Sequence, residues 1–215
     1  MQRQCFRAGA DIIAHGVRDQ PVDTAFIEEM KARSAWYVAT INLDETSYIF
    51  AEDPAWTKEG FFQTALQPAL RDRFSDPTYL QKTKTNPRVP IFKKAVANNK
   101  ANLKTLYEAG VKVEFGTDSG AQPQRIPGFA EHRELQLMVE SGLSPLEALE
   151  CATSNAAALI GLTDRGVLAP GKLADFVLLT ADSLVDIANT EKIPAVWHRG
   201  KKVSGPIETF SQNTD

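Results

Sequence analysis

Short apolar runs and amphipathic stretches alternate along the first part of the chain. Residues 12–14 form an apolar run, and between residues 22 and 34 apolar side chains recur near every 3.6 positions, as on one face of a helix. Those apolar positions are Val22, Phe26, Ile27 and Met30. A second apolar run occupies residues 36–41. Because a strand, a helix and a strand in succession are typical of a parallel sheet with crossover helices, the pattern predicts an α/β fold.

The same alternation returns near residue 90. The pattern predicts a helix from about Pro90 to Ala109, and Gly110 suits the position after it because glycine tolerates positive φ. A strand is expected at 111–115. It leads into GTDSG at 116–120, where glycines and small polar residues favour a tight loop at a strand end.

Two more helices are expected after this loop. The first runs over about residues 130–141. The second has a well-specified start, because Ser144 can cap the helix, Pro145 fits its first position and Glu147 completes a capping box. We expect this helix to end near Gly161.

Two regions depart from this alternation. Residues 42–88 mix aromatic residues with turn formers, which indicates an insertion at a loop, and its Trp56, Phe61 and Phe62 are interpreted as a local core rather than a substrate lid. Residues 162–203 contain short segments with turn signals, including strands expected at 174–179 and at 195–203, the latter folded about Gly200-Lys201. This second region predicts a small β-rich part, followed by a polar tail at 204–215.

Composition restricts the classes of partner. The chain has 215 residues, 43% of them hydrophobic and 24% charged, with a net charge of −3, so nothing basic points to nucleic acid. No apolar run reaches the 18 residues of a membrane span, and the N-terminus lacks the pattern of a signal peptide, so a cytoplasmic location is the default expectation. Cys5 and Cys151 lie far apart without CxxC spacing and are expected to be buried thiols.

Candidate chemistry gathers at the expected strand ends. His15 follows the first strand and Asp118 follows the third, while Thr40 lies at the end of the second. In α/β barrels the active site lies at the carboxyl ends of the strands, so these side chains would face one common site. Each residue alone has an ordinary interpretation, since a strand-end histidine is commonly a hydrogen-bonded core residue and this aspartate could form an Asx turn.

Five sequence segments, taken in order, strengthen the functional interpretation: IIAHG, WYVATI, GVKVEFGTDSG, EHRELQLMVESGLSPLEALECATSNAAALIGL and GVLAPGKLADFVLL. This series resembles the amidohydrolase superfamily, in particular its imidazolonepropionase-like and Xaa-Pro dipeptidase-like branch. The resemblance implies a (β/α)8 TIM barrel that holds one or two divalent metals, with a small β-sandwich built from segments before and after the barrel. The strands ending in His15, in residues 36–41 and in Asp118 look like its sixth, seventh and eighth.

The resemblance also implies roles for individual residues. His15 is similar to the sixth-strand metal ligand, and Asp118 to the eighth-strand aspartate that ligates the other metal and transfers the proton. The implied activity is hydrolysis of a C–N bond in an amide, cyclic amide or dipeptide, a small-molecule substrate, by metal-activated water, with zinc as the expected metal. We expect His132 and Thr40 to contact substrate or support the metal shell, although a solvent-exposed histidine at a helix start is an equal interpretation for His132.

Part of the family's site is missing from this sequence. The family's barrel also needs a His-x-His pair on its first strand, a bridging Lys or Glu on the fourth and a further His on the fifth, whereas this chain has only three histidines and no such pair. We therefore expect residues 1–161 to form the last three βα units of the barrel, with the insertion at about 42–88, and residues 162–203 to form the sandwich segment.

Three hypotheses for the function remain. In the first, the chain acts together with a missing N-terminal half or as a homo-oligomer, and is inactive alone. In the second, it is a non-catalytic remnant or interaction module that retains the fold. A third, a small independent α/β binding domain, would require the chain to fold alone as a cooperative monomer.

Overall fold

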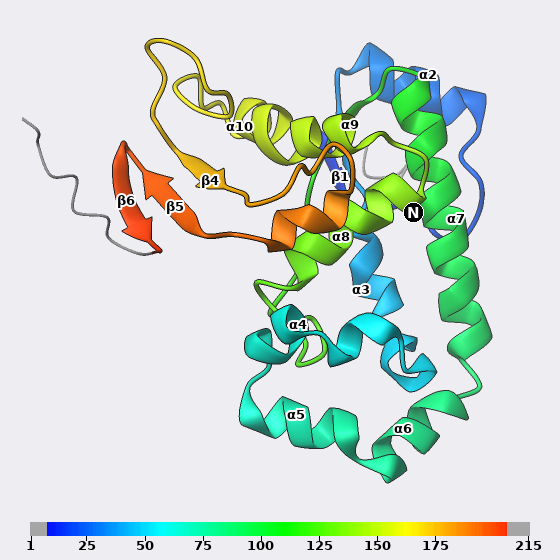
Figure 1. The fold of residues 1–215 in the computed structure, drawn as a ribbon. Helices are drawn as coiled ribbons and strands as arrows, with labels where there is room; N and C mark the ends of the chain where they lie inside the picture. Colours follow the sequence, from blue (N-terminus) through cyan, green and yellow to red (C-terminus); the bar gives the residue numbers. More distant parts are fainter. Residues whose placement is uncertain (1–7, 206–215) are drawn as a thin grey trace, which may run out of the picture.

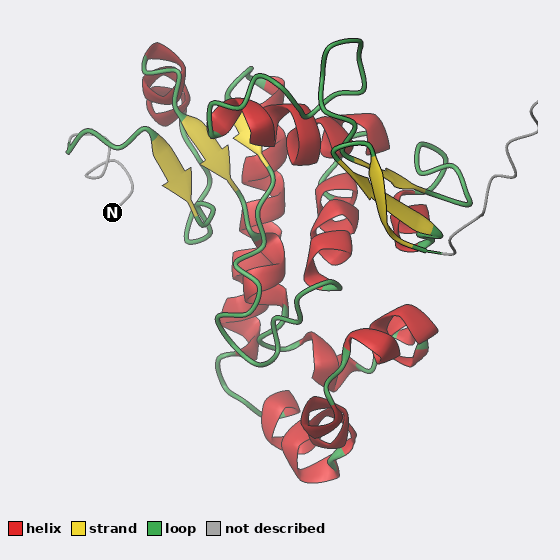
Figure 2. Cartoon of the chain, turned by 90° about the vertical axis from the view of Figure 1, so that its left-hand side faces the viewer, coloured by secondary structure: helices red, strands yellow, loops and turns green. Residues whose placement is uncertain are grey.

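The computed structural model of the protein describes residues 8–205. Cys5 and residues 206–215 of the expected tail lie outside this range. Figures 1 and 2 show three parts: a parallel sheet with long helices packed on it, a group of short helices at one end, and an antiparallel sheet that projects to one side. Among the described residues, no helix combines the length and the apolar character needed to cross a bilayer.

The parallel sheet has three strands in their order along the chain, β1 (Ile12–Ala14), β2 (Trp36–Val38) and β3 (Lys112–Glu114). Both neighbouring pairs are parallel, and Ile13, Tyr37 and Val113 lie in register across the sheet. The α/β class expected from the sequence is confirmed. The first strand has the expected bounds, the second ends three residues early, and the third is one residue shorter at each end.

One face of this sheet is buried along all three strands, whereas the other is exposed in part. Ile13, Tyr37 and Val113 are all buried, and they pack in one core with the apolar faces of α2 (Thr24–Ala32), α7 (Val89–Glu108) and α8 (Ala130–Glu140). The core side chains of these helices include Met30, Leu103, Leu106 and Leu137. On the opposite face, Ile12 is 44% exposed and Lys112 is exposed. Burial of each large apolar side chain on the covered face contributes roughly 1.5–3 kcal/mol, so that face holds the sheet to its helices.

The helical run after α8 follows the expected course. Ser144 and Glu147 form the capping box at the start of α9 (Pro145–Glu150), and the chain continues through a π-helical turn, η3 (Cys151–Asn155), into α10 (Ala156–Leu159). Asn155 donates a hydrogen bond of 2.9 Å from its amide nitrogen to the carbonyl of Val113, which ties the π-helical turn to β3. Cys151 is a buried free thiol, as expected.

The segment after β2 is helical and was predicted only as an irregular insertion. The expected strand at 36–41 was wrong at its end, because β2 stops at Val38, Thr40 takes a left-handed conformation with φ 47° and α3 (Ile41–Glu45) begins directly after it. The remaining elements of the segment are η1 (Ile49–Glu52), η2 (Ala55–Lys58), α4 (Gly60–Ala65), α5 (Pro68–Ser75) and α6 (Pro77–Lys84).

The aromatic residues of this segment build a second hydrophobic core, which we call the insertion core. Phe50, Phe62, Leu66, Ile126 and Phe129 are its buried members. Trp56 and Phe61 pack against it, so the interpretation of the aromatic cluster as a local core is confirmed. Since Ile126 and Phe129 come from the segment between β3 and α8, the insertion core joins two loops that follow neighbouring strands.

The C-terminal part forms an antiparallel sheet of β4 (Phe176–Leu178), β5 (Ala195–His198) and β6 (Lys201–Ser204), with the 3-10 helix η4 (Ile187–Glu191) before β5. The hairpin turns at Arg199-Gly200, one residue earlier than expected, since both have positive φ, 50° and 73°. Two residues with positive φ fit the strand twist of a tight hairpin. The described residues give one sheet here, so the second layer of a sandwich stays a prediction.

Side chains from β2 and α7 fix the loop that follows β1. Gly16 donates from its backbone to the carbonyl of Ala39 at 2.9 Å, and Val17 donates to the Tyr37 hydroxyl at 2.9 Å. Asn99 on α7 donates to the same Ala39 carbonyl at 2.9 Å and accepts from the Tyr37 hydroxyl at 3.2 Å. Burial raises the pKa of Tyr37 well above its usual value, so its hydroxyl keeps the proton that it donates. The backbone on the carboxyl side of β1 is therefore held rigidly.

This packing predicts that Gly16→Ala is destabilising. An added Cβ would lie 1.9 Å from Asn99 Oδ1 and 2.6 Å from the Tyr37 hydroxyl oxygen, so the hydrogen-bonded groups would have to move apart. We expect the free energy of unfolding to fall by about 1–3 kcal/mol, as for other overpacked sites, measured by urea denaturation. Gly60→Ala is the matched control, since no atom lies within 4 Å of its added Cβ. Equal urea midpoints for the two variants would contradict the prediction.

A second prediction concerns pH and Glu114, the last residue of β3. Burial raises its pKa to about 7. A carboxyl group whose pKa is higher in the folded state stabilises the fold below its unfolded pKa, near 4.5, and this contribution is lost as the pH rises through about 7. We expect the urea midpoint to decrease more between pH 5 and pH 8 in the natural protein than in Glu114→Gln. The same decrease in both proteins would show that Glu114 has no such linkage.

Candidate functional site

His15, Thr40 and Asp118 share an uncommon backbone conformation. Their φ angles are 63°, 47° and 55°, in the left-handed region that costs a non-glycine residue roughly 1–2 kcal/mol. Non-glycine residues held in this way cluster at functional sites, where the surrounding structure fixes them. Each of the three follows one of the three parallel strands, so the chain turns sharply at the same edge of the sheet three times.

His15 and Thr40 are in contact. Nδ1 of the imidazole lies 3.2 Å from the Thr40 hydroxyl oxygen, across the pair of strands β1 and β2. The direction of this hydrogen bond depends on the tautomer of the ring. Since the backbone beside His15 is held by the hydrogen bonds of Gly16 and Val17, the contact at Nδ1 contributes to the orientation of the imidazole.

Asp118 forms an ion pair that the sequence did not reveal. Its carboxylate accepts from the guanidinium of Arg125, and the side chains are 33% and 16% exposed, respectively. Within the described chain, Nε of Arg125 is buried without a hydrogen-bond partner. Arg125 lies in the polar loop AQPQR, where no periodicity or motif distinguishes it from a solvated residue.

Glu131 organises the loop around Asp118. Its carboxylate accepts from the hydroxyls of Thr117 at 3.0 Å and Ser119 at 2.6 Å, and from the backbone of Gly128 at 2.7 Å. Burial acts to raise the pKa of Glu131, but these hydrogen bonds outweigh it and lower the pKa below its usual value. The residues on both sides of Asp118 are thus bound to one carboxylate. The sequence contained one indication of the role of Glu131, because it is an acidic residue in the first turn of a helix next to a strand-end loop.

His132 faces a different environment. Its Nδ1 lies 3.0 Å from the Thr190 hydroxyl, and its ring makes an edge contact with Phe61 at 4.9 Å between centroids. Burial lowers the pKa of His132. Because these partners come from the insertion and from η4, the contact links parts of the fold, and a role toward substrate or metal stays a prediction.

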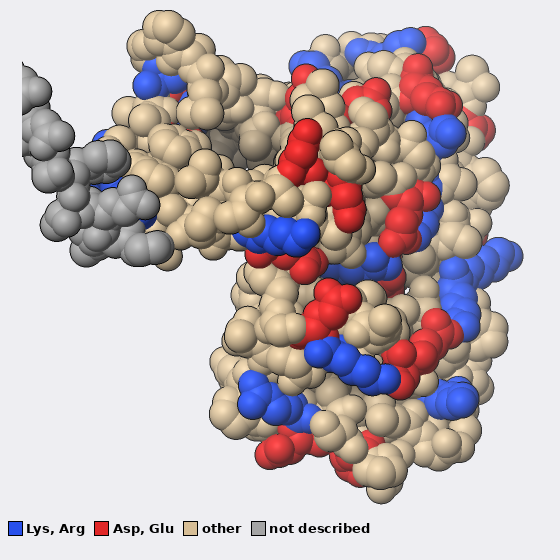
Figure 3. Space-filling model, viewed as in Figure 1, with Lys and Arg blue, Asp and Glu red and all other residues tan. Residues whose placement is uncertain are grey.

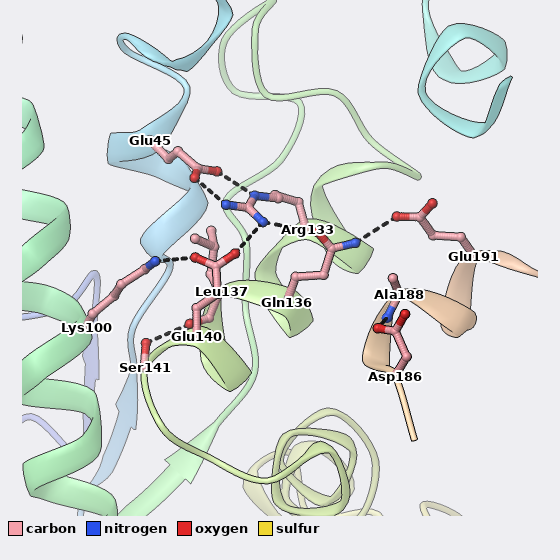
Figure 4. Close-up of polar contacts among 10 residues, drawn as sticks. All are labelled: Glu45, Lys100, Arg133, Gln136, Leu137, Glu140, Ser141, Asp186, Ala188 and Glu191. Carbon is pink, nitrogen blue, oxygen red and sulfur yellow. Dashed lines mark hydrogen bonds and ion pairs between the residues drawn. The ribbon is translucent and has the colours of Figure 1, made fainter. Parts of the chain in front are cut away.

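A buried charge network lies beside His132, on the same helix. Arg133 binds both carboxylate oxygens of Glu45 at 2.6 and 2.9 Å and one oxygen of Glu140 at 2.7 Å, as Figure 4 shows. Lys100 pairs with the other oxygen of Glu140. Burial acts to lower the pKa of Arg133, but its bonds with the two glutamates outweigh this and raise the pKa. On the surface viewed in Figure 3, by contrast, charges of both signs are interspersed.

The described residues do not form a metal site by themselves. Between residues 8 and 205, no group of three or more His, Cys, Asp and Glu side chains comes together in a way that could hold a metal ion. His15 and Asp118 offer one ligand residue each, whereas a catalytic zinc has about three from the protein. In addition, the carboxylate of Asp118 is bound to a cation, Arg125. A metal would need ligands from outside this set.

Known proteins are similar to this chain in both sequence and fold. An imidazolonepropionase from Deinococcus deserti is 42% identical over 102 residues, which are 46% of this chain and 25% of that protein. An adenine deaminase from Lysinibacillus sphaericus is 44% identical over 90 residues, which are 42% of this chain and 14% of that protein. The crystal structure of a Xaa-Pro dipeptidase with bound methionine superposes with a TM-score of 0.65 at 26% identity, covering 94% of this chain and 42% of that one.

The structure of an ochratoxinase from A. niger is similar, with a TM-score of 0.64 and 25% identity over 95% of this chain and 39% of that one. The matched part of the chain therefore covers less than half of each of these four proteins. The sequence model of the amidohydrolase family matches residues 60–203. Since this match includes more than half of the 215 residues, the chain belongs to the amidohydrolase family.

Proposed function

We propose that this chain provides the last three βα units of a (β/α)8 barrel in a metal-dependent amidohydrolase, with β1, β2 and β3 as the sixth, seventh and eighth strands. The observation that carries the proposal is the edge of the parallel sheet, where His15, Thr40 and Asp118 follow successive strands in left-handed conformations. In such barrels, strand ends at the carboxyl side supply the catalytic groups.

The reaction we propose is hydrolysis of a C–N bond in an amide, a cyclic amide or a dipeptide. The family match supports this, together with the similarity to an imidazolonepropionase and to a Xaa-Pro dipeptidase. A divalent metal, for which we propose zinc, would supply the Lewis acid that makes water a nucleophile near neutral pH. Because the described residues lack a complete donor set, we propose that the other ligands come from an N-terminal half of the barrel or from a second copy.

The contact with Thr40 suits His15 to a ligand's role. A histidine that binds zinc does so as neutral imidazole, through a nitrogen that carries no proton. If Nδ1 carries the proton and donates it to the Thr40 hydroxyl, 3.2 Å away, then Nε2 is the nitrogen with the lone pair. A hydrogen bond at the second nitrogen is the usual way in which proteins fix the tautomer of such a ligand.

For Asp118 we propose the role of proton acceptor and carrier. A carboxylate at the strand edge can take a proton from the attacking water and pass it to the leaving nitrogen. Arg125 orients this carboxylate and balances its charge, and Glu131 holds the residues on either side of it. For Asp118 to accept the proton, at least one of its oxygens must face the reacting water instead of Arg125.

One observation favours a second candidate, a non-catalytic interaction module that retains the fold. The described residues lack a complete set of metal ligands, and Asp118 is paired with Arg125. Both features are compatible with a chain that does not bind a metal. The two experiments below distinguish the candidates.

In the complete enzyme, Asp118→Asn is expected to reduce kcat by at least about 100-fold while the fold is kept. Asparagine has the same shape but cannot accept the proton, and groups in acid–base catalysis contribute typically 100-fold or more. Turnover is measured on a dipeptide or cyclic amide substrate, with circular dichroism to check the fold. Asp72→Asn, at an exposed position on α5, is the control. Turnover of Asp118→Asn close to that of the control would rule out the proton-transfer role.

The chain expressed alone is expected to bind zinc weakly and to show no appreciable turnover. In a site with two metals, His15 would bind one metal and Asp118 the other, so each metal would have one ligand from the chain. Water would then fill the remaining coordination positions. After dialysis against zinc, bound metal is measured by atomic absorption, and turnover on a panel of dipeptides, cyclic amides and esters. Tight stoichiometric zinc with metal-dependent turnover would show that the chain, or a dimer of it, has a complete site. If adding the N-terminal half restores neither property, the interaction module becomes the better explanation.

A further inference from the structure

Helix α3 is too short to be stable by itself, and it begins directly after Thr40 of the proposed site. It contains five residues, Ile41–Glu45, and all of them are buried. Isolated helices shorter than about 12–15 residues are marginal in water, because forming the first turn fixes several residues for one hydrogen bond. Tertiary contacts must therefore hold α3, and they determine the conformation of Thr40 directly before it.

The N-terminus of α3 has a cap from another helix. The carboxylate of Glu134 on α8 accepts from the backbone of Ile41 at 2.8 Å and of Asn42 at 2.7 Å, one bond on each oxygen. Glu134 is 1% exposed. The first N–H groups of a helix have no partner within it, and a negative charge there is favourable, so this carboxylate satisfies two donors that would otherwise be buried without partners.

Thr40 stands at the N-cap position and does not perform the usual task of a threonine there. A threonine at this position ordinarily accepts a hydrogen bond from the second or third helical residue through its hydroxyl. Thr40 makes no side-chain capping bond, and its backbone is left-handed with φ 47° and ψ 53°. Its hydroxyl lies against His15 Nδ1 instead.

The other end of α3 is also fixed, by the residue that precedes Glu134. Arg133 binds Glu45, the last residue of α3, through two hydrogen bonds. Arg18, three residues after His15, donates to Asp44 at 2.7 Å, so α3 is tied to the loop that carries His15 as well. Two successive residues of α8 thus hold both ends of α3, and α3 holds the loops that follow β1 and β2.

We propose that Glu134 is a positioning residue for His15: it caps α3 in place of Thr40, and so leaves the Thr40 hydroxyl to orient the imidazole. This inference rests on the proposed function, in which His15 is a metal ligand. A carboxylate buried at this depth has a large cost of desolvation, whereas a threonine cap would satisfy the helix without it. The arrangement is therefore explained by what it allows Thr40 to do.

The test observes the imidazole directly, in the full chain labelled with ¹⁵N at histidine. Long-range ¹H–¹⁵N spectra report the tautomer of each ring, and His15→Gln assigns the signals of His15. Burial raises the pKa of Glu134 to about 8, so spectra are recorded near pH 9, where its carboxylate can accept both bonds. We expect one tautomer of His15 to predominate, and the proposed ligand role requires that its proton be on Nδ1.

Two variants should then change His15 in the same way. Thr40→Val removes the hydroxyl, and Glu134→Gln puts an amide, which is itself a donor, against one of the two backbone donors. Each is expected to convert His15 to a mixture of tautomers, with His132 and His198 unchanged. Glu147→Gln, which disturbs the capping box of α9, should leave His15 as it is. A folded Glu134→Gln with the natural His15 spectrum would overturn the proposal.

Stability provides a second measurement, which holds even if Glu134→Gln fails to fold. Because the Thr40 hydroxyl bonds to His15 and does not cap α3, Thr40→Val should lower the urea midpoint of the natural chain and change it little in a chain that already carries His15→Ala. Ser144→Ala removes a true side-chain cap and should lower the midpoint equally in both chains. An equal loss of stability for Thr40→Val in both chains would mean that Thr40 acts on α3 and not on His15, which contradicts the proposal. None of these results depends on zinc or turnover. The positioning role of Glu134 can therefore be tested independently of the proposed hydrolase function.

Discussion

The chain that follows β2 is buried from residue 39 to residue 45, and its backbone N–H and C=O groups must find partners inside the protein. Side chains from the helices that cover the sheet supply them. Asn99 on α7 binds the Ala39 carbonyl, and Glu134 on α8 binds the first two N–H groups of α3. The same helices that bury the apolar face of the sheet thus also hold the turn that follows β2, and with it Thr40, which contacts His15.

Much of this arrangement could be predicted from local sequence. The capping box at Ser144 and the glycine after α7 are short-range signals, and both were predicted at their correct positions. The left-handed turn at Thr40 could not be predicted, because the helix start directly after it is capped by Glu134, more than 90 residues away, whereas local propensity alone favoured a strand through Ile41. The assignment of His15 and Asp118 came from a family resemblance, and Arg125 had no signal, since it becomes distinctive only through its contact with Asp118.

Within the proposed function, the incomplete donor set and the partly exposed face of the sheet have a common explanation in the length of the chain relative to its relatives. The dipeptidase that superposes on 94% of this chain is more than twice as long. A face that carries Ile12 and Lys112 toward solvent, and an edge with one histidine and one aspartate, are both what three βα units of a larger sheet would present. Within the proposed function, this chain by itself positions the two ligand residues, His15 and Asp118. The affinity for the metal would depend on the complete enzyme.

The insertion core gives the loop between β3 and α8 a second attachment. Ile126 and Phe129, which belong to that loop, are buried among Phe50, Phe62 and Leu66 of the segment after β2. A larger or smaller side chain in one loop would leave a clash or a cavity against the other loop. The sequences of the two loops are therefore expected to change together. Recombination that exchanged the segment after β2 between relatives would keep this packing only if it also exchanged Ile126 and Phe129.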